Sequence, residues 1–290
     1  MVSDCSFTLR AVARNLVLII TMGALLPAAG CTRSSEETTD PRGTAIVIFI
    51  DFSQSIGRSD RALFKQDFTN HIVPTLSAGD RILIAPINDK TLTAFHPLLD
   101  ETFPPKPEFD GWFDNTLKHE RRVKEADAQA VKLKESIQEQ VASIFDARQM
   151  SQQTDILSSL LVAEKLFHNQ PRHKVLVLMS DMIADYPPYR FDRMAWSAST
   201  NQKILSELDE KGLIPDLSGV CVYVSGVSAR SAELAARIGQ FWQEYFERTK
   251  ADMDPSRYAH VLLHWPPSKA CALDGGPSDT RQVVASKKEQ

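Results

Sequence analysis

One carboxylate and two hydroxyls follow directly after an unbroken apolar run, as Asp51, Ser53 and Ser55. A second apolar run ends just before Asp181, and Thr154 opens an apolar helical pattern between the two runs. Carboxylate and hydroxyl oxygens are hard ligands, which suit a small divalent cation such as Mg²⁺ or Mn²⁺. Loops at the carboxyl ends of strands are where open α/β sheets bind ligands. The sequence therefore predicts a divalent metal site built from these five residues.

Three of these residues also have a structural interpretation. Ser53 suits a turn, Thr154 suits a helix N-cap and Asp181 suits a cap at the end of a strand. Their occurrence in this order, at three loops of one predicted sheet edge, favours a metal site over three separate structural roles. The neighbouring Asp155 either helps to orient the loop or occupies a first-turn position that the helix dipole favours.

The ordered set resembles the metal-ion-dependent adhesion site (MIDAS) of the von Willebrand factor type A (vWA) family. That family combines a DxSxS motif, a distant threonine at a helix start and an aspartate after the fourth strand. In the family, serine hydroxyls bind the metal directly and the aspartates act largely through water or hydrogen bonds. Neutral ligands leave much of the ion's charge uncompensated, so the resemblance implies a protein partner that presents a carboxylate. The matching residues are Asp51, Ser53, Ser55, Thr154 and Asp181.

The resemblance covers about residues 44–265 and departs from the family pattern in two loops. Gln152 and Gln153 stand where a Gly-Gly pair often precedes the threonine, and Met182 stands where glycine often follows the late aspartate. Both departures concern loop geometry and leave every ligand oxygen in place.

Apolar runs that alternate with helical patterns predict an α/β fold. We expect a doubly wound, mostly parallel six-stranded sheet with one antiparallel edge strand and helices on both faces, the Rossmann-like vWA arrangement. The edge strand is expected at 91–99 and the last strand at 260–265. A long charged helix at about 115–149 is inserted, and it carries only a thin apolar stripe. This helix either packs on the domain by that stripe or projects as a partner surface.

The first thirty residues resemble a bacterial lipoprotein signal peptide. A basic start precedes an apolar stretch that is shorter than the roughly 20 residues of a spanning helix. Small residues then lead to Cys31, where we expect cleavage and lipid attachment. The alternatives are an ordinary secretory signal that is cleaved nearby and an uncleaved anchor. We therefore expect export and lipid anchoring in the bacterial cell envelope, on its periplasmic or surface face. The predicted organisation is a signal peptide at 1–30, a flexible tether at 31–43, the domain at 44–265 and a disordered tail at 266–290.

Charge and cysteine content restrict the remaining possibilities. The net charge of −4 argues against a general nucleic-acid binder. Cys221 lies in a strand pattern and Cys271 in the predicted tail. The two either form a disulfide or remain a buried inert thiol and a free thiol, and the second alternative is favoured.

Function is expected to be metal-dependent protein binding or assembly, without enzymatic activity. The sequence has no GxSxG, phosphate-binding glycine loop or HExxH motif. Tyr186, Tyr189 and Trp196 are candidates for partner contact, unless these aromatic side chains fold back onto the core. A metal-independent scaffold that acts through the long charged helix is the alternative, and a metal-dependent hydrolase is a third.

Overall fold

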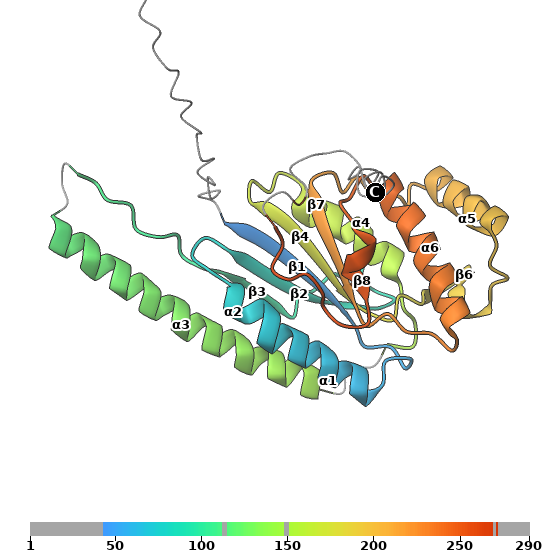
Figure 1. Cartoon of the computed structure of the whole chain (residues 1–290), viewed down its shortest axis with the longest axis horizontal. Coiled ribbons are helices and arrows are strands. Elements are labelled where there is room, and N and C mark those ends of the chain that lie inside the picture. Colours follow the sequence, from blue (N-terminus) through green and yellow to red (C-terminus); the bar gives the residue numbers. More distant parts are fainter. Residues whose placement is uncertain (1–42, 112–114, 148–150, 269–270, 272–290) are drawn as a thin grey trace, which may run out of the picture. The chain divides into compact units, whose positions relative to one another are not determined.

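A six-stranded sheet runs through the part of the chain that the computed structural model describes, residues 43–111, 115–147, 151–268 and 271 (Figure 1). The strand order is β3-β2-β1-β4-β7-β8, and only β2 and β3 pair in antiparallel fashion. This arrangement confirms the predicted sheet. The strands are β1 (Thr44–Asp51), β2 (Arg81–Ile87), β3 (Leu99–Thr102), β4 (His173–Met179), β7 (Val220–Ser225) and β8 (Tyr258–Ala259).

Helices cover both faces of this sheet, as predicted. α4 (Ile156–Phe167), α5 (Ala198–Glu210) and α6 (Ala232–Arg248) contribute side chains to the apolar core on one face. α1 (Arg58–Asp67) and α3 (Thr116–Asp146) contribute to the core on the other face. Shorter helical turns are the π-helical Phe68–Ile72, α2 (Val73–Thr75), Phe191–Arg193 and Pro255–Arg257.

The composition of β1 follows from its central position. Alternate side chains of a strand point to opposite faces, so a strand that is covered on both faces needs apolar residues throughout. Val47 and Phe49 belong to the core on one face, and Ile48 and Ile50 belong to the core on the other. The unbroken apolar run before Asp51 is therefore the pattern that a central strand requires.

The antiparallel edge strand lies later in the chain than the predicted 91–99. The chain makes turns before Leu99 instead, because the Thr91 hydroxyl accepts a hydrogen bond from the Asn88 amide (2.9 Å) and donates one to the Asn88 carbonyl (2.9 Å). β3 then pairs with β2 from Leu99 to Thr102.

The last strand was also predicted wrongly, at 260–265. β8 contains only Tyr258 and Ala259, which pair with the end of β7. Beyond it, the amide of Leu262 donates to the buried carboxylate of Asp67 (2.9 Å) instead of to a neighbouring strand. A side chain far away in the sequence thus ends the strand.

The long charged helix is present as α3, and the Asn115 side chain caps its first turn by accepting a hydrogen bond from the Lys118 amide (2.8 Å). Ile137, Val141 and Phe145 are buried, and all three lie in the carboxyl-terminal half of the helix. The single-stripe packing expected for this helix is therefore confined to that half. None of the described helices is long and apolar enough to cross a membrane.

Cys221 and Cys271 form a disulfide, so the favoured expectation of two free cysteines is wrong. The two residues are 50 positions apart, and nothing in that spacing reveals that position 271 lies beside β7. The bond attaches one point of the predicted 266–290 tail to the sheet.

The predicted signal peptide and Cys31 lie outside the described residues, as do the predicted tether up to residue 42 and most of the tail. These assignments stay predictions.

Candidate metal site

The carboxyl ends of β1 and β4 position the two aspartates of the candidate site. β1 and β4 are parallel neighbours, with Ile50 opposite Met179, so Asp51 at the end of β1 and Asp181 just after β4 lie at adjacent strand ends. The strand order reverses at this point, because the chain continues from β1 toward β2 on one side and from β4 toward β7 on the other. Crevices at such reversals are the usual ligand sites of doubly wound sheets.

The loop after β1 brings its oxygens together within one turn. Asp51 is fully buried, and its Oδ1 accepts a hydrogen bond from the Ser53 amide (2.8 Å). The hydroxyls of Ser53 and Ser55 lie 2.9 Å apart, and the Ile56 amide donates to the Ser53 carbonyl (3.2 Å), which closes the turn. The DxSxS spacing therefore places two hydroxyls and one carboxylate on one loop.

Ser180 joins the two aspartate loops. Its hydroxyl donates to Asp51 Oδ2 (2.9 Å) and accepts from the Met182 amide (3.0 Å). Met182 has a φ of 64°, which is the left-handed conformation that glycine adopts most easily. Its carbonyl accepts a hydrogen bond from the Trp242 indole (2.8 Å), and this contact helps to hold the loop. The departure at Met182 thus keeps the glycine-type backbone.

Backbone hydrogen bonds attach the Thr154 loop to both of the other loops. Thr154 and Asp185 exchange two such bonds (3.1 and 3.2 Å), and the Ser151 amide donates to the Phe52 carbonyl (3.2 Å). Gln153 stands where glycine is common, and its carbonyl accepts a hydrogen bond from the Ser151 hydroxyl (2.6 Å). The three predicted loops are therefore brought together at one edge of the sheet.

Asp155, rather than Thr154, is the N-cap of α4. Its side chain accepts a hydrogen bond from the Ser158 amide (3.0 Å). This cap leaves the Thr154 hydroxyl out of the helix terminus, and no hydrogen bond to that hydroxyl comes from elsewhere in the described ranges. The structural interpretation of Thr154 as an N-cap is therefore wrong.

Two buried carboxyl groups dominate the electrostatics of this edge. Burial raises the pKa of Asp51, while hydrogen bonds from Ser53 and Ser180 and the positive charge of Arg61 act in the opposite direction. Burial and the charge of Asp51 raise the pKa of Asp181 to about 7, although the Ile183 amide and the Ser55 hydroxyl donate to it. Two adjacent buried carboxyl groups with hydroxyls beside them form a donor set that fits a divalent cation.

Ser180 and Arg61 contribute to the site but were not predicted from the sequence. Ser180 directly precedes Asp181, so its place in the same loop could have identified it. Arg61 lies on α1, and no spacing in the sequence places its charge near Asp51.

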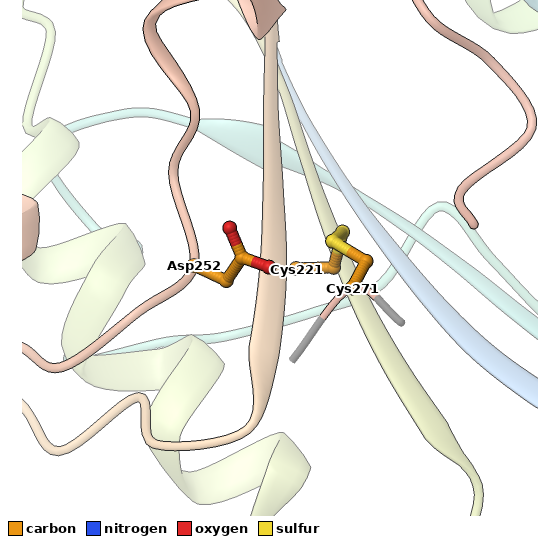
Figure 2. Close-up of side chains that lie close together, drawn as sticks. All are labelled: Cys221, Asp252 and Cys271. Carbon is orange, nitrogen blue, oxygen red and sulfur yellow. A yellow bond between two sulfur atoms is a disulfide. The ribbon is translucent and has the colours of Figure 1, made fainter. Parts of the chain in front are cut away.

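A second cluster of candidate ligands, shown in Figure 2, is not a metal site in this state. Cys221, Asp252 and Cys271 lie close together, but the two sulfur atoms are bonded to each other. The Arg257 guanidinium donates to both sulfurs (2.8 and 2.7 Å) and to Asp252. The cationic partner of this carboxylate is therefore an arginine.

The aromatic loop after β4 forms a small hairpin of β5 (Asp185–Tyr186) and β6 (Tyr189–Arg190). Tyr189 and Trp196 are 6% and 9% exposed, and the Trp196 indole donates to the Phe191 carbonyl (3.0 Å). These two side chains follow the alternative in which the aromatic residues fold back onto the core. Tyr186 is 37% exposed, beside the residue that bonds Thr154.

Comparisons with known proteins add little beyond the geometry. No family model matches the sequence, and no curated protein matches it. Solved structures with some similarity include proximal thread matrix protein 1 from the mussel byssus, at 14% identity and a TM-score of 0.31, over 63% of this chain and 37% of that one. The manganese-loaded TRAP protein of Plasmodium vivax follows at 9% identity and a TM-score of 0.32, over 69% of this chain and 63% of that one.

The SpRpn10 VWA domain is similar at 10% identity and a TM-score of 0.31, over 76% of this chain and 86% of that one. This chain spans less than two-thirds of the length of the first two structures. The doubly wound fold rests on the strand order of the chain itself.

Proposed function

We propose that this chain is an envelope-tethered domain that binds a protein partner in a manner dependent on Mg²⁺ or Mn²⁺. The observation that supports the proposal is the convergence of the three loops at the sheet edge where the strand order reverses. Asp51 and Asp181 lie there with the hydroxyl residues of the DxSxS loop and with Thr154. Isolated structural roles would not require these loops to meet.

The neutral and the acidic residues would have different roles at such a site. Ser53, Ser55 and Thr154 would supply neutral hydroxyl ligands, and the two aspartates would act through hydrogen bonds or bridging water. The bound ion would supply a positive centre that a carboxylate of the partner completes. The Ser180 hydroxyl donates a hydrogen bond to Asp51 Oδ2 (2.9 Å), so the Asp51 carboxylate is held in a fixed position beside the hydroxyl ligands.

Tyr186 is the aromatic candidate for partner contact that remains exposed. It directly follows Asp185, whose backbone bonds that of Thr154, so it lies one residue from a candidate ligand loop. Aromatic residues are enriched at binding hot spots. Tyr189 and Trp196 would then stabilise the hairpin by packing on the core instead of touching the partner.

Removal of the Thr154 hydroxyl should reduce partner capture at least tenfold, as should chelation, because both remove the metal that the partner's carboxylate needs. The measurement is affinity purification with the full-length tethered protein, with and without EDTA, followed by quantitative binding to the captured partner. Thr154→Ala and Tyr186→Ala are compared with Thr102→Ala, an exposed threonine at the opposite edge of the sheet.

Equal capture by Thr154→Ala, by chelated protein and by wild type would contradict metal-dependent binding. If binding then required α3, the alternative of a metal-independent scaffold would replace it.

The mature protein should begin at Cys31 and carry lipid on that residue. Small residues directly precede this cysteine, after an apolar stretch too short to span the membrane. Mass spectrometry of the mature N-terminus checks this expectation, with Cys31→Ala as the control that should lose the lipid mass. A soluble wild-type product that begins elsewhere would rule out the anchor.

A further inference from the structure

The amino-terminal half of α3 extends past the amino edge of the sheet, the edge at which the parallel strands begin. Lys134 lies level with α2, because its ammonium group donates to the Pro74 carbonyl (3.0 Å), shortly before the chain enters β2. The turns that precede Lys134, from Thr116 onward, span roughly 27 Å at 1.5 Å per residue. Figure 1 shows this half of α3 continuing beyond α2.

The segment after β3 lies along the start of this part of the helix. The Glu108 carbonyl accepts a hydrogen bond from Arg122 (3.2 Å), and the rings of Phe109 and His119 lie edge to face at 5.3 Å. We refer to residues 104–111 and 116–124 together as the tip. Its position relative to the sheet follows from β3, which ends at Thr102 opposite the start of β2.

The chain that precedes the domain enters at this same edge. β1 begins at Thr44 and runs parallel to β2, so the predicted tether joins the domain where the parallel strands start. A flexible twelve-residue chain has a root-mean-square length of about 20 Å. The tip and the start of β1 therefore lie at the same edge of the sheet, and the predicted tether is long enough for an anchored domain to bring the tip to a membrane surface.

The charge of the tip is opposite to what helix stability favours. Residues 116–124 contain four basic residues and one acidic residue, and residues 104–111 add one basic and two acidic residues, so the net charge of the tip is +2. Residues 125–146 contain two basic and five acidic residues. The positive end of the helix dipole lies at the amino terminus, so acidic first turns are the stabilising choice. The first turn of α3 has no acidic residue. The basic residues at this end of α3 therefore do not stabilise the helix through its dipole.

Exposed apolar side chains accompany this charge. Leu117 is 77% exposed and Phe109 is 53% exposed, and both belong to the tip. Lys118, Arg121 and Lys124 are exposed around them, and the Arg121–Glu125 ion pair is highly exposed, so it holds the arginine only weakly. Basic side chains with a few protruding apolar ones are typical of surfaces that bind anionic lipid bilayers.

We propose that the tip of α3 docks on the anionic phospholipid surface of the membrane to which the chain is tethered. The proposal rests on the lipid anchor in the proposed function, which would hold the tip within tens of ångströms of that surface. Lysine and arginine side chains each strengthen contact with an anionic surface about fivefold, and Leu117 and Phe109 would enter the interfacial region. An acidic protein partner of the tip is the competing occupant.

The test uses the full-length lipidated chain reconstituted in vesicles of phosphatidylcholine, with or without phosphatidylglycerol. Leu117→Cys is labelled with an environment-sensitive fluorophore, and Val261→Cys, which follows β8 near the opposite edge, is the labelled control. Cys221 and Cys271 are protected from labelling by their disulfide. We expect a blue shift and quenching by lipid-borne quenchers at position 117, in phosphatidylglycerol vesicles only.

Charge reversal separates electrostatic docking from mere proximity. Lys118→Glu/Arg121→Glu/Lys124→Glu should remove the shift, as should about 0.5 M salt, which screens exposed charges. Lys90→Glu/Lys165→Glu/Lys203→Glu changes the net charge equally at other exposed sites and should leave the shift intact.

Vesicle flotation reports the anchor independently of the fluorophore. Flotation of every variant without any shift at position 117 would overturn the docking proposal and favour a protein partner for the tip. Failure to float would instead refute the anchor on which both proposals depend. A shift of equal size in phosphatidylcholine vesicles would also overturn docking on anionic lipid.

Discussion

Replacing Asp51 with asparagine should abolish the stabilisation of the folded domain by Mg²⁺ or Mn²⁺. Asparagine keeps the shape and the acceptor that the Ser53 amide uses, but it removes the negative charge beside the hydroxyl ligands. A ligand at about 100 times its Kd adds roughly 2.7 kcal/mol to the free energy of unfolding. For a domain of this size that corresponds to a rise in Tm of about 5–10 °C.

The measurement is thermal unfolding of wild type and Asp51→Asn, each with millimolar metal and with EDTA. Asp209→Asn, which removes an exposed carboxylate of α5, serves as the control and should keep the full shift. Identical melting of wild-type protein with metal and with EDTA would mean that the site is vestigial. Unfolding of Asp51→Asn in EDTA would be a failure of the variant, so Ser53→Ala provides the second test.

Metal-free protein should lose stability as the pH rises from about 5 to 8, and Asp181 should account for much of the loss. Its pKa is about 7 in the folded state and near 3.8 when unfolded, so the folded state binds more protons between these values. The stabilisation is complete below the unfolded pKa and disappears as the pH rises through about 7. A shift of this size is worth on the order of a few kcal/mol. Bound metal replaces the proton, so stabilisation by metal should grow over the same window.

Chemical denaturation in EDTA at several pH values measures this dependence. Asp181→Asn keeps the acceptor for the Ile183 amide but cannot titrate, so its stability should change less between pH 5 and 8. Titrating groups away from the site are common to both proteins and cancel in the difference, so the comparison reports on Asp181 together with its coupled neighbour Asp51. Equal loss of stability in the two proteins would show that Asp181 is already ionised throughout.

The fold was predictable where burial alone determined the residue pattern. Ile46 to Ile50 are apolar on both faces because β1 is covered on both, and the same reasoning located β4 and β7. The edge elements were not predictable in this way. Thr91 closes a local turn, and Asp67 takes the amide of Leu262, so β3 and β8 depend on polar contacts that periodicity does not record.

The same distinction holds for the site. Asp51, Ser53, Ser55, Thr154 and Asp181 could be selected as candidates from the sequence because strand ends can be read from apolar runs. The pKa of Asp181, the charge of Arg61 and the left-handed backbone of Met182 depend on packing between distant segments. The Cys221–Cys271 pair belongs to the same class.

The central position of β1 determines how this domain would carry a mechanical load. With lipid at the amino end of β1 and a partner held jointly by the loops after β1 and β4, part of the load would pass from β1 to its neighbour through their shared hydrogen bonds. The strand pairs with β2 and β4 over its length, so a pull along its axis shears many hydrogen bonds at once instead of peeling them one by one. Forced unfolding is governed by the unfolding rate, and simultaneous loading of both ladders slows that rate. A bond to the cell envelope made through this domain would therefore resist detachment under flow better than its equilibrium stability alone suggests.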